Sequence, residues 1–250
     1  IDAVVEGQSD ALTDDLAPAL WYARGVTQRE AGDADAAMAD FHQALHFDPL
    51  HRDTLLALAE VERDAGRFND AIEHELRALT ITQDAMERAS IYFRLGELWS
   101  DGTGNFDEAG ACFELAQSEG LDTRNLHHRL FRHFQHVGEL DRALDMIDQL
   151  MSSADDADEL ATLWLARGDI YASMEEMHDQ AIEAFDYALS YDPMRHEARH
   201  GLARVLEARG DWNELLQILD AIAEGGTEAE QALLGSLLLN NRTFDELEGI

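Results

Sequence analysis

The order of apolar and polar residues along this chain has the period of an amphipathic helix. Apolar residues recur at intervals of three and four, in blocks separated by short polar turns, which predicts one buried face on each of many short helices. Residues 21–49 give the clearest example, with a turn at Gly32 and a stop at Pro49. The positions expected to join the two helices of this stretch are Trp21, Gly25, Ala37, Phe41, Ala44 and Pro49.

The residue sizes at these positions predict an antiparallel helix pair. Two helices approach to about 8–10 Å only where the facing side chains are small and larger residues fill the space beside them. Gly25, Ala37 and Ala44 are small, while Trp21 and Phe41 are large. We therefore expect the pair to pack closely at the small residues, with the aromatic rings filling the interface.

The pattern recurs, and a longer period lies over it. Five further helix pairs follow, and a seventh first helix is expected at residues 228–240. Residues of one type recur 72 positions apart, so the larger unit is a duplicated pair of helix pairs. The residues that show this period are Gly66, Gly138 and Gly210; Phe41, Phe113 and Phe185; and Ala37, Ala109 and Ala181.

The pattern of an aromatic residue, Gly, Ala, Phe and Pro over about 34 residues resembles the tetratricopeptide repeat (TPR). The resemblance implies an all-α fold, an α-solenoid in which antiparallel helix pairs form a right-handed superhelix with a concave groove. We expect one array over residues 18–250, with six repeats and a truncated seventh. Residues 1–17 would be a lead-in or the end of a preceding repeat. Leu95-Gly96, residues 101–104 and Ala116 in the third repeat also resemble the related Sel-like repeat.

The charge balance restricts the partners. The chain has 52 acidic and 18 basic residues, a formal net charge of -34, and its basic residues are all Arg. Such a surface repels nucleic acid and anionic membranes, so we expect neither as a partner. A halophilic-like adaptation to high salt, or a preference for Arg codons, explains the composition more simply than a dedicated basic ligand does.

Candidate chemistry other than binding finds little support. The four His of residues 127–136 lack the H-E-x-x-H motif of a helical zinc site, and His127 and His133 match apolar packing positions of other repeats. Residues 101–107 resemble the start of an EF-hand but lack its terminal Glu, which favours a plain turn. Cys112 has no His placed to activate it. We predict a protein that is not an enzyme and that has no cofactor and no metal.

The TPR resemblance implies that ligands meet the fifth, ninth and thirteenth residues of each first helix. The family's clamp for a terminal carboxylate is not found, since only Arg94 matches it. A stripe of Arg and His is expected instead, which would receive a segment with apolar and acidic residues. The alternative is that these Arg residues only form ion pairs with neighbouring helices, Arg132 with Glu97 and Asp169, and Arg204 with Asp169. The predicted partner-binding residues are Leu56, Phe93, Arg94, His128, Arg132, His136, Leu165, His200 and Arg204.

The function predicted is a protein–protein interaction scaffold that binds a peptide segment or helix of a partner in the groove. The alternative is a structural or regulatory array packed against other domains of a longer chain. Ile1 is not an initiator Met and the last repeat is incomplete, so we expect a fragment. A cytoplasmic location is expected, and a periplasmic one stays open. The sequence does not predict an oligomeric state.

Overall fold

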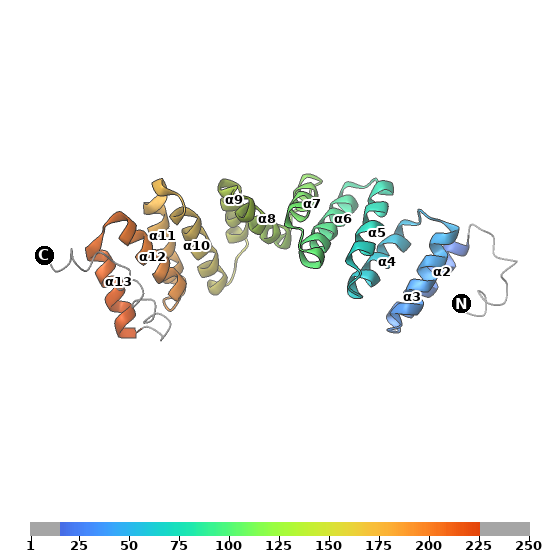
Figure 1. Cartoon of the computed structure of the whole chain (residues 1–250), viewed down its shortest axis with the longest axis horizontal. Helices are drawn as coiled ribbons and strands as arrows, with labels where there is room; N and C mark the ends of the chain where they lie inside the picture. The colour runs from blue at the N-terminus through green and yellow to red at the C-terminus, as the bar shows by residue number, and fades with distance from the viewer. Residues whose placement is uncertain (1–15, 226–250) are drawn as a thin grey trace. The chain divides into compact units, whose positions relative to one another are not determined.

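Antiparallel helices connected by short turns make up the first of two units in the chain. The computed structural model describes residues 16–225, and its two units are residues 1–137 and 138–250. In unit 1 successive helices pack as antiparallel pairs (Figure 1). They are α2 (Ala17–Glu30), α3 (Ala34–Phe47), α4 (Arg52–Asp64), α5 (Phe68–Ile81), α6 (Ala85–Glu97), the π-helical turn η1 (Leu98–Thr103), α7 (Phe106–Ser118) and α8 (Arg124–Val137).

Unit 2 follows the same plan. Its boundary at Gly138 falls between the two helices of the fourth expected repeat, and the single array expected from the sequence stays a prediction. The expected seventh repeat and nearly all of the lead-in lie outside the described residues. The helices of unit 2 are α9 (Leu140–Ser152), α10 (Ala157–Ala172), the 3-10 turn η2 (Glu175–Met177), α11 (His178–Tyr191), α12 (His196–Arg209) and α13 (Trp212–Gly225).

Local signals in the sequence set the helix ends. Pro18 lies in the first turn of α2, where its missing N–H costs nothing. The Asp33 carboxylate caps α3 by accepting a hydrogen bond from the backbone N–H of Ala36 at 3.0 Å. Between these helices Gly32 has a φ of +84°, the left-handed conformation expected from the sequence. The predicted helix–turn–helix is therefore confirmed.

A glycine–phenylalanine contact joins the helices of the first, third and fifth pairs. A Cβ on Gly25 would lie 2.5 Å from Cε1 of Phe41, far inside van der Waals contact, so only Gly fits there. Gly96 meets Phe113, and Gly168 meets Phe185, in the same way. The three Phe rings are buried, and each contributes about 1.5–3 kcal/mol relative to an exposed side chain.

The third helix pair has a longer turn than the first. After α6 the chain continues through η1, and Gly104 at φ +72° then reverses it. The Asn105 side chain caps α7, accepting from the backbone N–H of Glu108 at 3.4 Å. The extra turn carries Ser100 and Asp101 towards α8, as the bonds between Asp101 and Arg129 show. Residues 98–103 therefore form part of the site described below.

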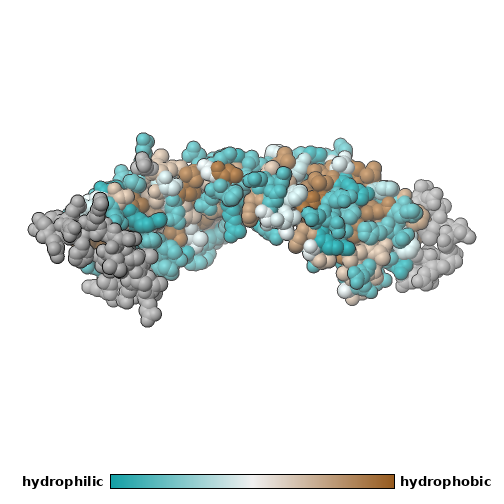
Figure 2. Space-filling model, in the orientation of Figure 1, coloured by the Kyte–Doolittle hydropathy of each residue, from teal (hydrophilic) through white to brown (hydrophobic). Residues whose placement is uncertain are grey.

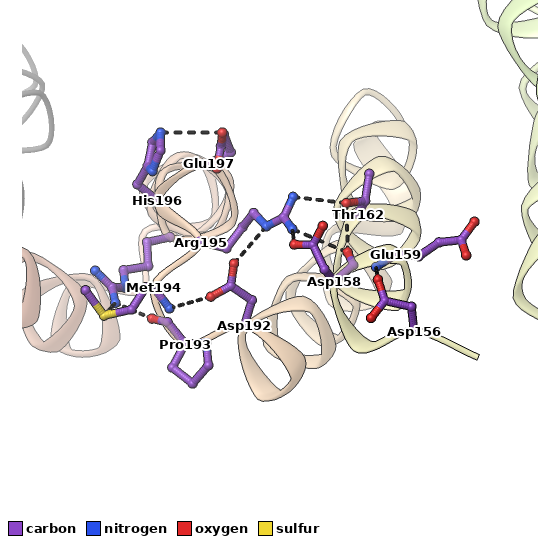
Figure 3. Close-up of polar contacts among 11 residues, drawn as sticks. Asp156, Asp158, Glu159, Thr162, Asp192, Pro193, Met194, Arg195, His196 and Glu197 are labelled. Carbon is purple, nitrogen blue, oxygen red and sulfur yellow. Dashed lines mark hydrogen bonds and ion pairs between the residues drawn. The ribbon is translucent and has the colours of Figure 1, made fainter. Parts of the chain in front are cut away.

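Arg195 connects three elements of unit 2 at the start of α12 (Figure 3). Its guanidinium donates to the Asp158 carboxylate at 2.5 Å and to Thr162 Oγ1 at 3.0 Å, both on α10. Its Nε donates to Asp192 Oδ2, just after α11, at 3.1 Å. Because these acceptors belong to neighbouring helices, Arg195 fixes how α12 begins relative to α10 and α11.

One face of the described part of the chain is mainly hydrophilic (Figure 2). On the face shown in Figure 2, hydrophilic residues surround smaller groups of hydrophobic ones. Among residues 16–225, no helix combines the length and the apolar content needed to span a bilayer.

Candidate ligand-binding pockets

The unit 1 pocket, which is lined by residues of η1, α7 and α8, has a volume of about 210 Å³. Its walls combine aromatic rings, small residues and basic side chains. The residues that line it are Ser100, Asp101, Phe106, Ala109, Gly110, Phe113, Arg129, Arg132, His133 and His136.

Aromatic residues form the apolar part of this pocket. The Phe113 ring is 3% exposed and belongs to the core. Phe106 is 56% exposed, and its ring centroid lies 5.8 Å from that of His136. A large apolar ring left half in solvent next to a pocket offers contact area to an apolar side chain of a ligand.

Arg129 and Asp101 form a bidentate ion pair in the wall of the pocket. The guanidinium donates to both carboxylate oxygens at 2.7 Å, and more weakly to Glu97 Oε1 at 3.4 Å. Hydrogen bonding from Arg129 lowers the pKa of Asp101, and the same bond raises the pKa of Arg129. Both groups therefore stay ionised, and their charges largely cancel.

Arg132 has no such partner. Its side chain is exposed, and within residues 16–225 no hydrogen bond or ion pair reaches it, although its charge helps to lower the pKa of Asp101. In a chain with a net charge of -34, an unpaired guanidinium at the edge of a pocket is a local attraction for an anion.

His133 completes the wall next to α7. Its Nε2 lies 3.4 Å from Glu114 Oε1, and its Nδ1 is buried and finds no partner among the described residues. The ring packs directly on the α-carbon of Gly110, where a Cβ would come within 1.9 Å of Cε1 and Nδ1. His133 therefore both packs, as the sequence predicted, and borders the pocket.

A second pocket occupies the equivalent position in unit 2, with a volume of about 480 Å³. Six of its seven lining residues lie 72 positions after a residue that lines the unit 1 pocket, and the seventh, Asp169, lies 72 after Glu97. The equivalent pairs are Ser100 and Ala172, Asp101 and Ser173, Phe106 and His178, Arg132 and Arg204, His133 and Val205, and His136 and Ala208.

The unit 2 pocket contains Arg204 at the position equivalent to Arg132, but the neighbours of this Arg differ. An oxygen of Asp169 lies 3.9 Å from the Arg204 guanidinium. Partial burial raises the pKa of Asp169, against the opposing effects of Arg204 and His200. Partial burial, followed by the charge of Arg204, lowers the pKa of His200. This pocket therefore holds a carboxylate within ion-pair distance of its Arg, whereas the carboxylate of the unit 1 pocket, Asp101, is hydrogen-bonded to Arg129 and not to Arg132.

The structure brings three predicted site residues into pockets, namely Arg132, His136 and Arg204. Arg94 instead donates to both oxygens of Glu75, a carboxylate that is 2% exposed, at 2.6 and 3.0 Å. Arg94 thus pairs with a buried carboxylate inside unit 1.

The other predicted residues lie outside the pockets. Leu56 and Leu165 pack against the cores of unit 1 and unit 2. The ring centroids of Phe93 and Phe113 are 5.6 Å apart. His128 and His200 are partly buried on α8 and α12, one helical turn before Arg132 and Arg204.

Sequence reasoning did not select Asp101, Phe106, Arg129 or Gly110 as site residues. The 72-residue period already contained the useful signal, because Arg132 and Arg204 obey it. The sequence also predicts the turn at residues 101–107. Which side chains that turn brings to α8 depends on the π-helical geometry of η1, which no simple periodicity predicts.

Two groups that could suggest other chemistry have ordinary environments. His127 is buried, and its Nε2 lies 2.9 Å from Asp122 Oδ1, as expected for a packed histidine. Burial raises the pKa of the Cys112 thiol to about 11, so little nucleophilic thiolate exists near neutral pH. The described residues contain no group of three or more His, Cys, Asp and Glu placed to hold a metal ion.

The helix pairs and their Gly–Phe contacts define an α-solenoid class of repeat protein. Two sequence models of the tetratricopeptide repeat match residues 22–86 and 172–237. The chain belongs to the tetratricopeptide repeat family. Neither matched range includes residues 95–116, so the Sel-like resemblance of the third repeat stays a prediction. No curated protein sequence matches the chain significantly.

Several solved structures share this fold. YrrB, described as a TPR protein with an unusual peptide-binding site, is 19% identical with a TM-score of 0.61, over 79% of this chain and 98% of its own. The C-terminal part of a TPR repeat-containing protein from Cytophaga hutchinsonii is 16% identical with a TM-score of 0.58, over 79% of this chain and 78% of its own. MamA is 22% identical with a TM-score of 0.56, over 72% of this chain and 94% of its own. At these identities the similarity shows the fold alone.

Proposed function

We propose that this protein is a non-catalytic scaffold that binds a peptide segment of a partner protein, and that the segment carries both acidic and apolar residues. The observation that carries the proposal is the unpaired guanidinium of Arg132 beside the half-exposed ring of Phe106, in a chain with a net charge of -34. Charge complementarity then selects an acidic segment, and the ring selects an apolar neighbour.

The second pocket supports the same proposal. Arg204 occupies the position of Arg132 in unit 2, so two equivalent basic positions are available to one partner or to two. The partly buried His128 and His200 precede these Arg residues by one turn and are proposed as flanking contacts. The description of YrrB as peptide-binding is consistent with a peptide ligand for this fold, although it says nothing of which peptide.

The experiment is selection from a random peptide library displayed on phage, with the purified chain as bait. Peptides enriched by the wild type are then measured against a double variant, Arg132→Glu with Arg204→Glu, by isothermal titration calorimetry. The matched control is Arg63→Glu with Arg142→Glu. It makes the same charge change, one per unit, at exposed Arg residues that contact acidic neighbours on or beside their own helices, Asp64 and Glu139.

We expect the enriched peptides to combine acidic and apolar residues, and to lose affinity at least tenfold more in the pocket variant than in the control variant. Selection without enrichment would contradict the scaffold function itself. If the enriched peptides bind both variants equally, the protein is still a scaffold, but its binding site lies elsewhere.

A further inference from the structure

We propose that the unit 1 pocket is a subsite for one carboxylate with an adjoining aromatic side chain, and that Asp101 sets this preference by occupying Arg129. The inference rests on the proposed function and specifies the ligand that one of its pockets takes. It concerns unit 1 alone, because Ser173 and Gly201 replace Asp101 and Arg129 at the equivalent positions of unit 2.

The charges in the pocket favour a monoanion. Both terminal nitrogens of the Arg129 guanidinium donate to the Asp101 carboxylate, so this ion pair adds almost no net charge. Of the two guanidinium groups that line the pocket, Arg132 is therefore the one that no hydrogen bond or ion pair within residues 16–225 engages. A carboxylate carries one negative charge and matches it, whereas a phosphate monoester carries about 1.5 to 2 and would leave charge unpaired.

The size of the pocket favours a side chain over a free metabolite. Its volume of about 210 Å³ lies below the roughly 300–1,000 Å³ typical of sites for small organic ligands. One carboxylate at Arg132 and one ring against Phe106 and His136 would fill it. The existing pair of Phe106 and His136, with ring centroids 5.8 Å apart, provides a surface on which a third ring can pack.

Asp101 acts here as an internal competitor. Its two oxygens hold the Arg129 fork in the bidentate arrangement that a bound carboxylate would adopt. Replacing Asp101 with Asn removes the charge and half of this pairing, which leaves Arg129 with Glu97 at 3.4 Å as its charged neighbour. Arg129 would then face the pocket beside Arg132 with only this longer contact to Glu97 opposing its charge, and the preference should move towards a doubly charged ligand.

The test uses three short peptides, acetylated and amidated so that their ends carry no charge. Each has a central Phe followed by Asp, by Asn or by phosphoserine. Binding to the ¹⁵N-labelled full chain is followed by NMR at about 0.15 M NaCl, where long-range repulsion is screened. The proteins compared are the wild type, Arg132→Gln, Asp101→Asn and the control Arg63→Gln.

For the wild type we expect the Asp peptide to shift resonances of residues 100–113 and 129–136, and to bind at least fivefold more tightly than the Asn peptide. Arg132→Gln should abolish that difference, while Arg63→Gln should keep it. Asp101→Asn should raise the affinity for the phosphoserine peptide relative to the Asp peptide at least threefold. Matching amide spectra of the variants would show that each still folds.

Three results would overturn the inference: no binding of the Asp peptide to the wild type, equal binding of the Asp and Asn peptides, or shifts confined to other residues. An unchanged ligand preference in Asp101→Asn would remove the role given to Asp101. None of these results would contradict the scaffold function, which depends on the independent selection of longer peptides. Failure of the two proposals can therefore be told apart.

Discussion

The ring of His133 lies directly on the α-carbon of Gly110, so close that a Cβ at Gly110 would come within 1.9 Å of two ring atoms. This contact joins α7 to α8 at the wall of the unit 1 pocket. It exists because the smallest residue and a flat ring occupy facing positions. In unit 2 the equivalent positions carry Ile182 and Val205, which pack as ordinary aliphatic side chains do.

Gly110→Ala should therefore destabilise unit 1, even though Ala is the better helix former by about 0.5–1 kcal/mol. The clash with His133 should cost more than this gain, for a net loss of about 1–2 kcal/mol in the free energy of unfolding. Chemical denaturation checks the loss. In the double variant with His133→Ala the clash is absent, so a Gly110→Ala substitution that is equally harmful in both backgrounds would argue against the contact.

His200 should titrate below the usual histidine pKa of about 6.5, because partial burial and the charge of Arg204 both disfavour its protonated form. Arg204→Gln should raise this pKa and Asp169→Asn should lower it further. Titration of the imidazole resonances by NMR measures all three values. A His200 pKa that does not respond to Arg204→Gln would contradict the geometry of the unit 2 pocket.

The same shift gives unit 2 a dependence on pH. A histidine with a lowered pKa stabilises the fold above about pH 6.5, and this contribution is lost as the pH falls, because the unfolded state takes up the proton first. The raised pKa of Asp169 has the opposite effect on stability, because it favours the folded state as the pH falls. This effect belongs to the lower pH range in which carboxyl groups titrate. Between pH 7.5 and 5.5, His200→Gln should thus lose less thermal stability than the wild type does.

Arg195→Gln should destabilise unit 2, because it removes charge-assisted hydrogen bonds that join the start of α12 to α10 and to Asp192. We expect a loss of about 1 kcal/mol, since several of the partner groups are exposed to solvent. Arg204→Gln serves as the control, because its ion pair is longer, at 3.9 Å, and exposed. Equal losses in both variants by thermal denaturation would show that Arg195 does not connect these helices.

Salt should stabilise the whole chain. A net charge of -34 causes repulsion within the folded state, and 0.1 M salt screens charges beyond about 10 Å. The melting temperature should accordingly rise with NaCl concentration. A flat or falling melting temperature up to molar salt would mean that the acidic surface is already balanced locally.

The helices and their pairing could be predicted from the sequence because they depend on local rules. The apolar period gives the buried face, Gly32 ends α2 with a positive φ, and the spacing of Gly25 and Phe41 anticipates the contact that the structure shows. Each of these features involves residues within one helix pair, so the repeat pattern is sufficient to locate them.

The pocket was only partly predictable because it depends on side chains from three elements. Arg132 and His136 were selected from their register on one helix. Whether Arg129 or Arg132 is the free cation depends on where η1 places Asp101, and the structure shows that Asp101 binds Arg129. Arg94 matched a binding position of the TPR family, yet in the structure its guanidinium donates to the buried Glu75 carboxylate. Pairing of this kind follows from tertiary packing and not from spacing.

The central claim is that the unpaired Arg132 and its counterpart Arg204 bind acidic segments. It is tested most directly by calorimetric titration of one selected peptide against the wild type, the variant with Arg132→Glu and Arg204→Glu, and the Arg63→Glu with Arg142→Glu control. We predict an affinity at least tenfold weaker for the pocket variant than for the control. Equal affinities for the two variants would contradict the claim.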